Sequence, residues 1–550
     1  MGSVAQNGKA ATVDRHRGDW DPASEAERLQ SLLQAVAAME PFTPTRLRRL
    51  LSRHRRSDGQ PFSKDQLVAG YKWLCERGDL PPNPELLRRL RMKPVRTLSG
   101  VAPVAVMTKP FPCPGECIFC PEDVRMPKSY LPDEPGAMRA ERYRFDPYEQ
   151  TAGRIEALER IGHTADKVEL LILGGTWSYY PPDYQEWFIR RCLEAMNGTE
   201  ARSLVEAQRA NETAPHRNVG LVIETRPDYI TPEEVQRLRY LGVTKVQLGV
   251  QSLDDRILAL NRRGHTVEDV RRAMALLRAA GFKIAVHWMP NLLGATPESD
   301  LEDFRRLWTD PALRPDELKI YPTALLDNTA LYDHWRRGEY KPYSTETLVE
   351  LLIACKQTIP PYCRVNRVIR DIPAGHIVAG NTLSNLREIV QREMGKRGLR
   401  CRCIRCREVR GQPVEPERLR RREITYETTV SREHFLSYET PEGKLVGFLR
   451  LSLPDPAAQA ATGLEEIVGS AMIREVHVYG PALAIGAERS DEAQHAGLGG
   501  RLIAWAREIA HRAGYRRLAV IAAVGTRGYY RRHGFVLGET YVLGPSVLGP

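Results

Sequence analysis

Three cysteines stand close together in the sequence, in the spacing Cys-x-x-x-Cys-x-x-Cys. They are Cys113, Cys117 and Cys120, and they follow directly on residues 101–108, whose apolar pattern predicts a buried strand. Three thiolates can hold three irons of a 4Fe–4S cube, and no fourth cysteine stands near enough to hold the last iron. An open iron can bind a substrate, so the spacing predicts a catalytic cluster. A zinc site and unrelated thiols are the alternatives.

A second group of cysteines, Cys401, Cys403 and Cys406, has the spacing Cys-x-Cys-x-x-Cys. Positive surroundings favour thiolates, and three thiolates need one further ligand to close a tetrahedral zinc site. We expect a structural zinc with His376 as the fourth ligand, and with Cys363 or a water as the substitute. A second redox cluster and unligated thiols are the alternatives. The positive neighbours are Arg400, Arg402, Arg405, Arg407 and Arg410.

The segments around the first cysteine group alternate between apolar strand patterns and amphipathic helix patterns. Six β/α units in succession predict a parallel sheet, closed or partly closed as a barrel, with its chemistry at the carboxyl ends of the strands. The predicted strands span residues 101–108, 167–176, 219–228, 245–252, 283–290 and 317–323.

A Cys-x-x-x-Cys-x-x-Cys loop after the first strand of such a barrel resembles the loop of the radical S-adenosylmethionine (radical SAM) superfamily. The resemblance implies a 4Fe–4S cluster whose open iron chelates SAM and whose electron cleaves it to methionine and a 5′-deoxyadenosyl radical. Other strand ends suit a cofactor at the same rim, because glycine lets backbone approach closely and charged side chains can bind ribose or carboxylate. The candidate cofactor residues are Gly174, Gly175, Glu224, Arg226 and Gln251. Lys319 and Tyr321, in the sixth predicted strand, are candidate catalytic residues with a basic and a hydroxyl group.

A glycine-rich segment, QHAGLG, leads directly into a helix pattern near the C-terminus. Free backbone N–H groups and the positive helix end would face one point, which suits a pyrophosphate. The segment resembles the acetyl-CoA loop of GNAT acetyltransferases, and GTRGYYRRHGF resembles the GNAT region that contacts the thioester sulfur. Tyr529 or Tyr530 could hydrogen-bond or protonate that sulfur, but adjacent helix positions cannot both face it, and we favour Tyr530. The expected acetyl-CoA residues are Gln494, His495, Gly497, Leu498 and Gly499.

The chain of 550 residues carries a formal net charge of +11, and excess positive charge attracts polyanions such as nucleic acid. Helix patterns within residues 24–91 and the segment after them carry many cations with few acids between them. We expect this surface to follow nucleic-acid phosphates, with solvated helix faces as the alternative. The cations are Arg46, Arg48, Arg49, Arg53, Arg55, Arg56, Arg88, Arg89, Arg91, Lys93 and Arg96. Without a signal-peptide pattern or a long apolar run, a cytoplasmic protein is expected.

These patterns predict an α/β protein of four parts. Residues 1–92 form a basic helical region that binds nucleic acid, which the resemblance named next implies to be tRNA, and residues 93–395 form a radical SAM partial (β/α)6 barrel. Residues 396–423 form a Cys-rich zinc-binding linker, and residues 424–550 form a GNAT α/β domain.

The order of the motifs resembles the catalytic subunit of Elongator, and in particular its prokaryotic members. TKPFPCPGECIFCP, IETRPDYIT, ELKIYPT, CRCIRCREV and VGTRGYYRRHGF carry the resemblance, which runs from about Arg88 to the C-terminus. It implies an enzyme that uses SAM and acetyl-CoA to place a carboxymethyl-type group on C5 of the wobble uridine in the tRNA anticodon stem-loop, without other Elongator subunits. The radical would take a hydrogen from the acetyl-CoA methyl, the carbon radical would add to uridine C5, and the thioester would be hydrolysed.

Two other functions remain open at this point. A protein lysine acetyltransferase with a structural barrel is the main rival, with Glu475 as its general base. It would acetylate protein without consuming SAM. A nucleic-acid-binding scaffold without chemistry is disfavoured, because the cluster cysteines and the whole pyrophosphate loop are present.

Overall fold

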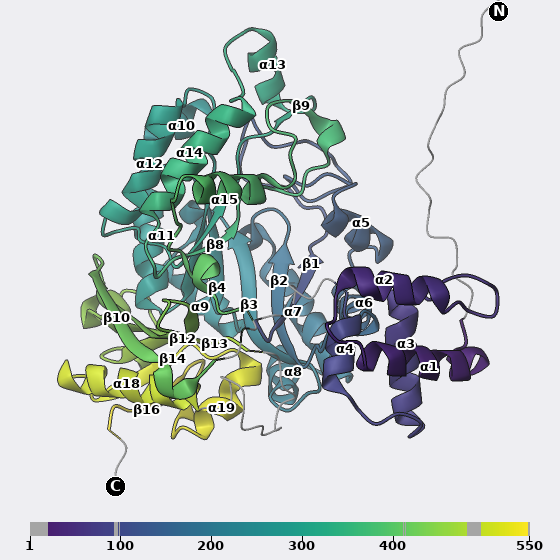
Figure 1. Cartoon of the computed structure of the whole chain (residues 1–550). Helices are drawn as coiled ribbons and strands as arrows, with labels where there is room; N and C mark the ends of the chain where they lie inside the picture. Colours follow the sequence, from purple (N-terminus) through teal and green to yellow (C-terminus); the bar gives the residue numbers. More distant parts are fainter. Residues whose placement is uncertain are drawn as a thin grey trace, which may run out of the picture. The chain divides into compact units, whose positions relative to one another are not determined.

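The computed structural model describes residues 20–92, 97, 99–410, 412, 414–480 and 497–547. The chain forms two compact units: residues 1–95 with 156–163, and residues 96–155 with 164–550. Figure 1 labels the helices and strands in chain order. The predicted cofactor and metal residues that the structure describes all belong to the second unit.

The first unit contains helices whose apolar residues recur three and four positions apart. One face of its first helix buries Leu29, Leu32, Leu33 and Val36, and the other helices complete the apolar core. Polar side chains cap the starts of the next three helices, which satisfies backbone N–H groups that have no partner within a helix. The helices are α1 (Ala26–Ala37), α2 (Pro44–Arg53), α3 (Lys64–Glu76) and α4 (Pro84–Leu90).

The larger part of the second unit is built on a sheet of seven parallel strands, in the order β1-β2-β3-β4-β5-β6-β8. The six strands predicted from the sequence are confirmed, although each is shorter at its carboxyl end. The short strand β8 was not predicted, because its residues, RVNR, have no apolar run. The strands are β1 (Ala102–Met107), β2 (Lys167–Leu173), β3 (Arg217–Thr225), β4 (Lys245–Gln251), β5 (Lys283–Trp288), β6 (Glu317–Ile320) and β8 (Arg364–Arg367).

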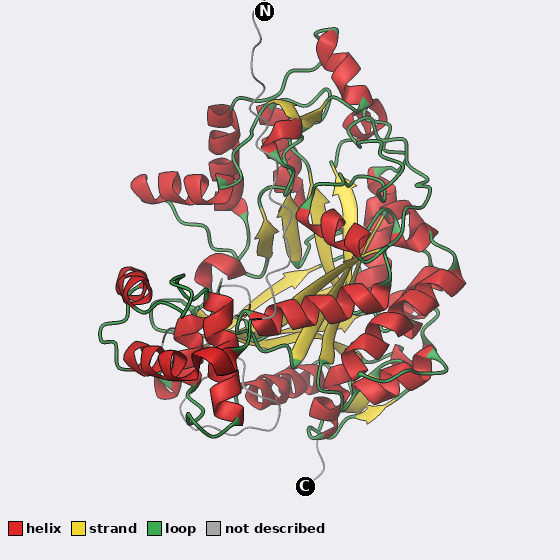
Figure 2. Cartoon of the chain, turned by 90° about the vertical axis from the view of Figure 1, so that its right-hand side faces the viewer, coloured by secondary structure: helices red, strands yellow, loops and turns green. Residues whose placement is uncertain are grey.

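Helices alternate with these strands along the chain, as parallel connections require. Figure 2 shows the yellow strands in the interior with red helices outside them. The helices are α5 (Pro135–Arg142), α6 (Pro147–Arg160), α7 (Pro182–Asn197), α8 (Leu204–Asn211), α9 (Pro232–Tyr240), α10 (Asp255–Leu260), α11 (Val267–Ala279), α12 (Pro297–Thr309), α13 (Ala330–Arg336), α14 (Thr345–Thr358), α15 (Leu386–Lys396) and α16 (Ile404–Arg407). Strands β7 (Leu325–Leu326) and β9 (Ile377–Ala379) form a small separate sheet.

A second sheet of seven strands follows, in the order β10-β11-β12-β13-β14-β16-β15. Its pairs are antiparallel except β13 and β14, which are parallel and joined through α18. The strands are β10 (Arg420–Glu427), β11 (Ser431–Glu439), β12 (Leu445–Pro454), β13 (Ala471–Val478), β14 (Arg517–Val520), β15 (Val536–Leu537) and β16 (Val542–Pro545). The helices are α17 (Pro456–Ala460), α18 (Leu498–Arg512) and α19 (Arg527–Arg531).

Buried charged side chains connect the two large sheets. The guanidinium of Arg474 on β13 donates to Asp316, which precedes β6, and to Glu433 on β11 at 2.8 Å. All three side chains are buried. Since breaking a buried ion pair leaves an uncompensated charge, these contacts fix one sheet against the other.

Among the residues that the structure describes, no helix has the length and apolar character needed to cross a lipid bilayer.

Candidate functional site

Cys117 is the most strongly activated thiol of the first cysteine group. The Cys120 thiol donates a hydrogen bond to it, which lowers the pKa of Cys117 to about 5 against the opposing effect of burial. The guanidinium of Arg263, whose Nη1 lies 3.3 Å from the Cys117 sulfur, lowers this pKa further, and so does that of Arg226. Cys117 is therefore a thiolate at neutral pH, which is the form that binds iron.

Cys113 faces a different part of the same rim. Its sulfur lies 3.7 Å from the Thr176 hydroxyl, directly after the glycines that end β2. In the described part of the chain, the three sulfurs of this first group do not converge within 4.8 Å of one another. This spacing fits a cube better than a single ion, because each thiolate of a 4Fe–4S cluster binds a different iron.

Among the residues that the structure describes, several buried polar atoms of Arg226, Arg263 and the neighbouring His265 have no hydrogen-bond partner. They belong to Arg226 (Nη1), Arg263 (Nε) and both ring nitrogens of His265. Burial, and then the charge of Arg263, lowers the pKa of His265 to about 3, so its ring is neutral. A Cβ at Gly115, between the cysteines, would collide with Arg226 Nη1. Unsatisfied guanidinium groups next to thiolates fit an anionic group such as an iron–sulfur cluster with its bound cofactor.

Three of the predicted site residues meet inside the barrel. Lys319 Nζ donates to Glu224 Oε1 at 2.8 Å, and the Tyr321 ring centroid lies 5.9 Å from the same ammonium. Burial opposes ionisation of Glu224, but Lys319 and His287 outweigh it and lower the pKa of Glu224 to about 2. Tyr130 donates to the other carboxylate oxygen at 3.2 Å. Glu224 is thus a fixed anion with direct protein partners.

Arg226, Gly174 and Gln251 also lie at this end of the barrel. Arg226 pairs with Asp228 at 2.9 Å and keeps one Nη free. Gly174 has φ +119°, and a Cβ there would collide with the Thr108 hydroxyl. Gln251 has φ +72° and a buried amide oxygen that has no partner in the described part of the chain. Gly175, with φ +53°, completes the glycine turn after β2.

The sequence analysis missed Arg263, His265, Tyr130 and His287. Arg263 and His265 flank a glycine in NRRGH, a polar turn after α10, and this position beyond a predicted strand could have marked them. His287 stands in the otherwise apolar β5 and lies 3.1 Å from the Gln247 amide oxygen. Tyr130 belongs to an irregular loop, and no local pattern connects it with Glu224.

The glycine-rich loop of the second sheet is described only in part. Gln494 and His495 lie outside the described residues. Gly497 is the N-cap of α18 with φ +64°, and a Cβ there would meet open space. Leu498 begins the helix and is buried. The free N–H groups of the first turn of α18 therefore follow directly on this glycine.

Tyr529 and Tyr530 face different ways. A Cβ at Gly499 would collide with the Tyr529 hydroxyl, so that hydroxyl lies against the first turn of α18. Tyr530 is buried with its ring 5.9 Å from the Phe535 ring. Burial raises the pKa of Tyr529 to about 12, which keeps its proton in place at neutral pH. The Tyr529 hydroxyl is thus the one that lies beside the start of α18, whereas the preference for Tyr530, whose ring packs in the core, stays a prediction.

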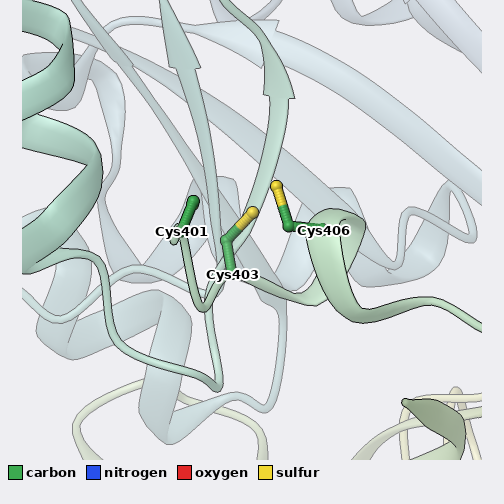
Figure 3. Close-up of side chains that lie close together, drawn as sticks. All are labelled: Cys401, Cys403 and Cys406. Carbon is green, nitrogen blue, oxygen red and sulfur yellow. The ribbon is translucent and has the colours of Figure 1, made fainter. Parts of the chain in front are cut away.

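The second cysteine group forms a compact site. The sulfur atoms of Cys401, Cys403 and Cys406 all lie within 4.8 Å of one another, and Figure 3 shows these side chains on a loop and the short helix α16. The thiols of Cys401 and Cys406 donate to Cys403, which lowers its pKa well below the usual range. Convergence of three sulfurs on one point fits a single metal ion, since Zn–S bonds are about 2.3 Å long.

The expectation for His376 is not met. His376 is not part of the three-cysteine group, and its Nε2 lies 2.6 Å from a carboxylate oxygen of Asp133. The chain between β8 and β9 carries it to this partner. The Cys363 thiol is not part of the group either, although the Cys363 carbonyl accepts from the Ile404 N–H at 2.9 Å. The fourth ligand must come from elsewhere than His376.

Comparison with known proteins gives the class and then the family. Residues 112–307 match the Radical SAM superfamily, and residues 315–396 match the Radical SAM C-terminal domain. With the barrel and the cysteine loop, these matches define a radical SAM protein.

The relatives narrow this class. The tRNA uridine(34) acetyltransferase of Dehalococcoides mccartyi is 45% identical over 81% of this chain and 98% of its own length. Elongator complex protein 3 of Drosophila melanogaster is 38% identical over 94% of this chain and 95% of its own length. The solved structure of Methanocaldococcus infernus Elp3 with its N-terminus (1–46) deleted has 40% identity and a TM-score of 0.70, covering 81% of this chain and 99% of that one. The chain belongs to the family of the tRNA uridine(34) acetyltransferases and Elongator complex protein 3.

Proposed function

We propose that this protein is an enzyme that modifies C5 of the wobble uridine, uridine 34, in the anticodon stem-loop of tRNA, with SAM and acetyl-CoA as co-substrates. The observation that carries the proposal is that one compact unit holds both a three-cysteine loop with an activated thiolate and a glycine N-cap suited to a pyrophosphate. Family membership supports the same reaction, since relatives at 44–45% identity are named for uridine 34.

Cys113, Cys117 and Cys120 would hold the 4Fe–4S cluster, and Arg226 and Arg263 would offset its negative charge. A bound cluster with SAM supplies a strongly oxidising carbon radical. The protein's own side chains would orient the cofactor. Lys319 keeps Glu224 ionised, so the Glu224 carboxylate can accept hydrogen bonds from the cofactor. The buried Lys319 and the half-buried Tyr321 would face the substrates at the same rim.

The second sheet would bind acetyl-CoA in the manner of a GNAT domain. The N–H groups at the start of α18 would bind the pyrophosphate after Gly497, where a side chain is absent and the helix end is positive. Tyr529 would donate its hydroxyl proton to the thioester sulfur as a hydrogen bond, because that hydroxyl lies beside Gly499. Gln494 and His495 would extend the same loop.

The basic helices of the first unit would bind tRNA phosphates. Arg48, Arg49 and Arg53 on α2 are exposed, and among the described residues they form no ion pair. Arg88 and Arg89 instead pair with Glu85. Arg91 donates to the Gly162 carbonyl, while Lys93 and Arg96 lie outside the described residues. We therefore expect the exposed arginines of α2 to make most of the contacts with tRNA phosphates.

Cys401, Cys403 and Cys406 would hold a structural zinc, with a water as the fourth ligand. The site lies between the end of the barrel helices and the first strand of the second sheet, where a metal stabilises a segment with little regular structure. We further propose that the protein acts in the cytoplasm and without other Elongator subunits.

The geometry of Glu475 argues against the lysine acetyltransferase reading. Its carboxylate lies 2.6 Å from Lys283 Nζ and 2.9 Å from Arg450 Nε, and the pKa of Glu475 is lowered to about 2. Burial opposes this shift, and the two cations outweigh it. A carboxylate so strongly stabilised as an anion is a poor general base, because it gains little by taking up a proton.

The experiment that tests the function combines all substrates. Reconstituted protein is incubated with tRNA, SAM, acetyl-CoA labelled in the methyl carbon and a low-potential reductant, and the nucleosides are then analysed by mass spectrometry. We expect label on C5 of uridine 34 and formation of 5′-deoxyadenosine, both lost when SAM is omitted. Label on protein lysines with no use of SAM would overturn the proposal in favour of the rival.

A further inference from the structure

Five aromatic side chains form a continuous row beside the first cysteine group. The centroids of successive rings lie 4.9–6.0 Å apart, and the pairs are stacked, tilted or edge-to-face. Aromatic rings attract one another at these distances, so the row is one packed surface. In order, this aromatic row consists of Tyr229, Tyr179, Phe111, Tyr180 and Tyr184.

Hydrogen bonds fix part of the aromatic row to the barrel. The buried Tyr180 donates its hydroxyl proton to the Lys109 carbonyl at 2.9 Å, and the Thr108 hydroxyl lies 2.8 Å from the same oxygen. The Tyr184 hydroxyl accepts from the Lys109 N–H at 3.0 Å. Because these rings are held before any ligand arrives, a flat group that stacks on the row meets a preorganised surface.

The aromatic row also reaches solvent. The Tyr179 side chain is 40% exposed. Phe111, Tyr184 and Tyr229 are half-buried. The exposed Lys109 lies over the Tyr184 ring, with Nζ 4.9 Å from the ring centroid. Within the described part of the chain Lys109 forms no ion pair, so the surface combines flat apolar rings with a cation that a phosphate can bind.

The aromatic row adjoins the loop of the first cysteine group. Phe111 stands two residues before Cys113 in the chain. Tyr179 stands three residues after Thr176, whose hydroxyl lies 3.7 Å from the Cys113 sulfur. A base that is modified at this end of the barrel therefore brings its neighbouring nucleotides to the same surface.

We propose that the aromatic row stacks the unpaired bases next to uridine 34 in the anticodon loop of tRNA, while Lys109 contacts a phosphate of the same strand. Proteins recognise single-stranded RNA loops by stacking bases on aromatic side chains, because every base has a flat π face. The cation beside the rings favours RNA over an apolar protein surface as the occupant. The inference rests on the proposed tRNA reaction and adds the part of the RNA that this surface holds.

The test compares variants of the exposed Tyr179 in full-length reconstituted protein. Tyr179→Leu keeps an apolar side chain but removes the flat ring, whereas Tyr179→Phe keeps the ring. Affinity for an anticodon stem-loop RNA is measured by fluorescence anisotropy. We expect Tyr179→Leu to weaken binding about tenfold and Tyr179→Phe to remain within about twofold of the parent, because stacking on one base is lost only in the former.

A second RNA makes the test specific for stacking. In this RNA the nucleotide on one side or the other of uridine 34 is abasic, so no base is present to stack. At the side that contacts Tyr179, the parent should lose about tenfold in affinity and Tyr179→Leu should lose almost nothing more, because ring and base contribute through one contact.

The control is a tyrosine of equal exposure in another place. Tyr240 is also 40% exposed, and it ends α9, at the opposite end of the barrel from the cysteine loop. Tyr240→Leu should bind both RNAs as the parent does. Parental affinity in Tyr179→Leu, or equal losses with the abasic RNAs in parent and variant, would overturn the stacking proposal and leave the proposed function standing. A parent that binds the stem-loop no better than a duplex of the stem alone would overturn both.

Discussion

Replacing Glu475 by glutamine tests which of two roles this carboxylate has at the junction of the two sheets: an ion that stabilises the fold, or a catalytic base. Glu475 on β13 bridges Lys283 on β5 and Arg450 on β12. Glutamine has nearly the same shape but no charge, so of the carboxylates that the structure describes Lys283 keeps only Glu317, at 3.4 Å, as an ion-pair partner. If Glu475 is structural, the variant should lose stability and retain its chemistry per folded molecule.

The size of the loss follows from the ionisation of Glu475. Despite burial, Lys283 and Arg450 lower the pKa of this carboxyl from 4.5 to about 2. Each tenfold change in an ionisation constant corresponds to about 1.4 kcal/mol, so the charged form contributes about 3 kcal/mol to folding at neutral pH. Because the folded pKa is the lower one, this contribution is present above pH 4.5 and disappears as the pH falls towards 2. Glutamine cannot supply it at any pH.

The assay measures thermal unfolding of parent and variant at pH 7 and at decreasing pH, beside the rate of acetyl-CoA consumption. We expect Glu475→Gln to melt several degrees lower at pH 7, with a difference that narrows below pH 4.5, and to retain at least a third of the parent rate. Glu465→Gln, on an exposed turn, is the control and should match the parent in both. An unchanged melting temperature with a hundredfold loss of rate would refute the structural role and restore Glu475 as a base.

Three further predictions concern the cofactors and tRNA. Cys117→Ser should abolish formation of 5′-deoxyadenosine and the iron–sulfur absorption, because the serine hydroxyl does not ionise at neutral pH as this thiol does. Gly497→Glu should weaken acetyl-CoA binding, measured by calorimetry, at least tenfold, because it places a carboxylate at the anion site and a side chain at φ +64°. Asparagine tolerates this φ and carries no charge, so Gly497→Asn should bind acetyl-CoA more tightly than Gly497→Glu. Replacing Arg49 and Arg53 by glutamine should reduce the slope of log affinity for tRNA against log salt concentration by about 1.5. Arg56 pairs with Asp58, so Arg56→Gln is the control and should leave this slope unchanged.

Each of these predictions has an outcome that contradicts it. Cys75→Ser, in the first unit, is the control for the cluster, and deoxyadenosine at the parental rate in Cys117→Ser would remove the cluster from this loop. Equal acetyl-CoA affinities for the two Gly497 variants would mean that the pyrophosphate lies elsewhere. An unchanged salt slope in the Arg49, Arg53 variant would mean that α2 does not contact phosphates.

The sequence by itself determined the elements and the chemistry that they carry. The six strands of the barrel were predictable because apolar runs alternate with amphipathic helices, and this periodicity is local. The spacings of Cys113, Cys117 and Cys120 are also local, so the first cysteine loop was recognisable as a cluster site. The short β8 was not predictable, since a four-residue strand with charged residues has no such pattern.

Only the tertiary structure decided which of these residues meet. Lys319 and Glu224 stand 95 positions apart and pair because parallel strands bring their ends to one rim. His376 was expected at the zinc site, yet the path of the chain after β8 gives it to Asp133. Tyr529 is half-buried and Tyr530 is buried, and this difference depends on what packs against α19. Periodicity fixes local conformation, but contacts between distant residues depend on strand order and packing, and no single stretch of sequence contains these.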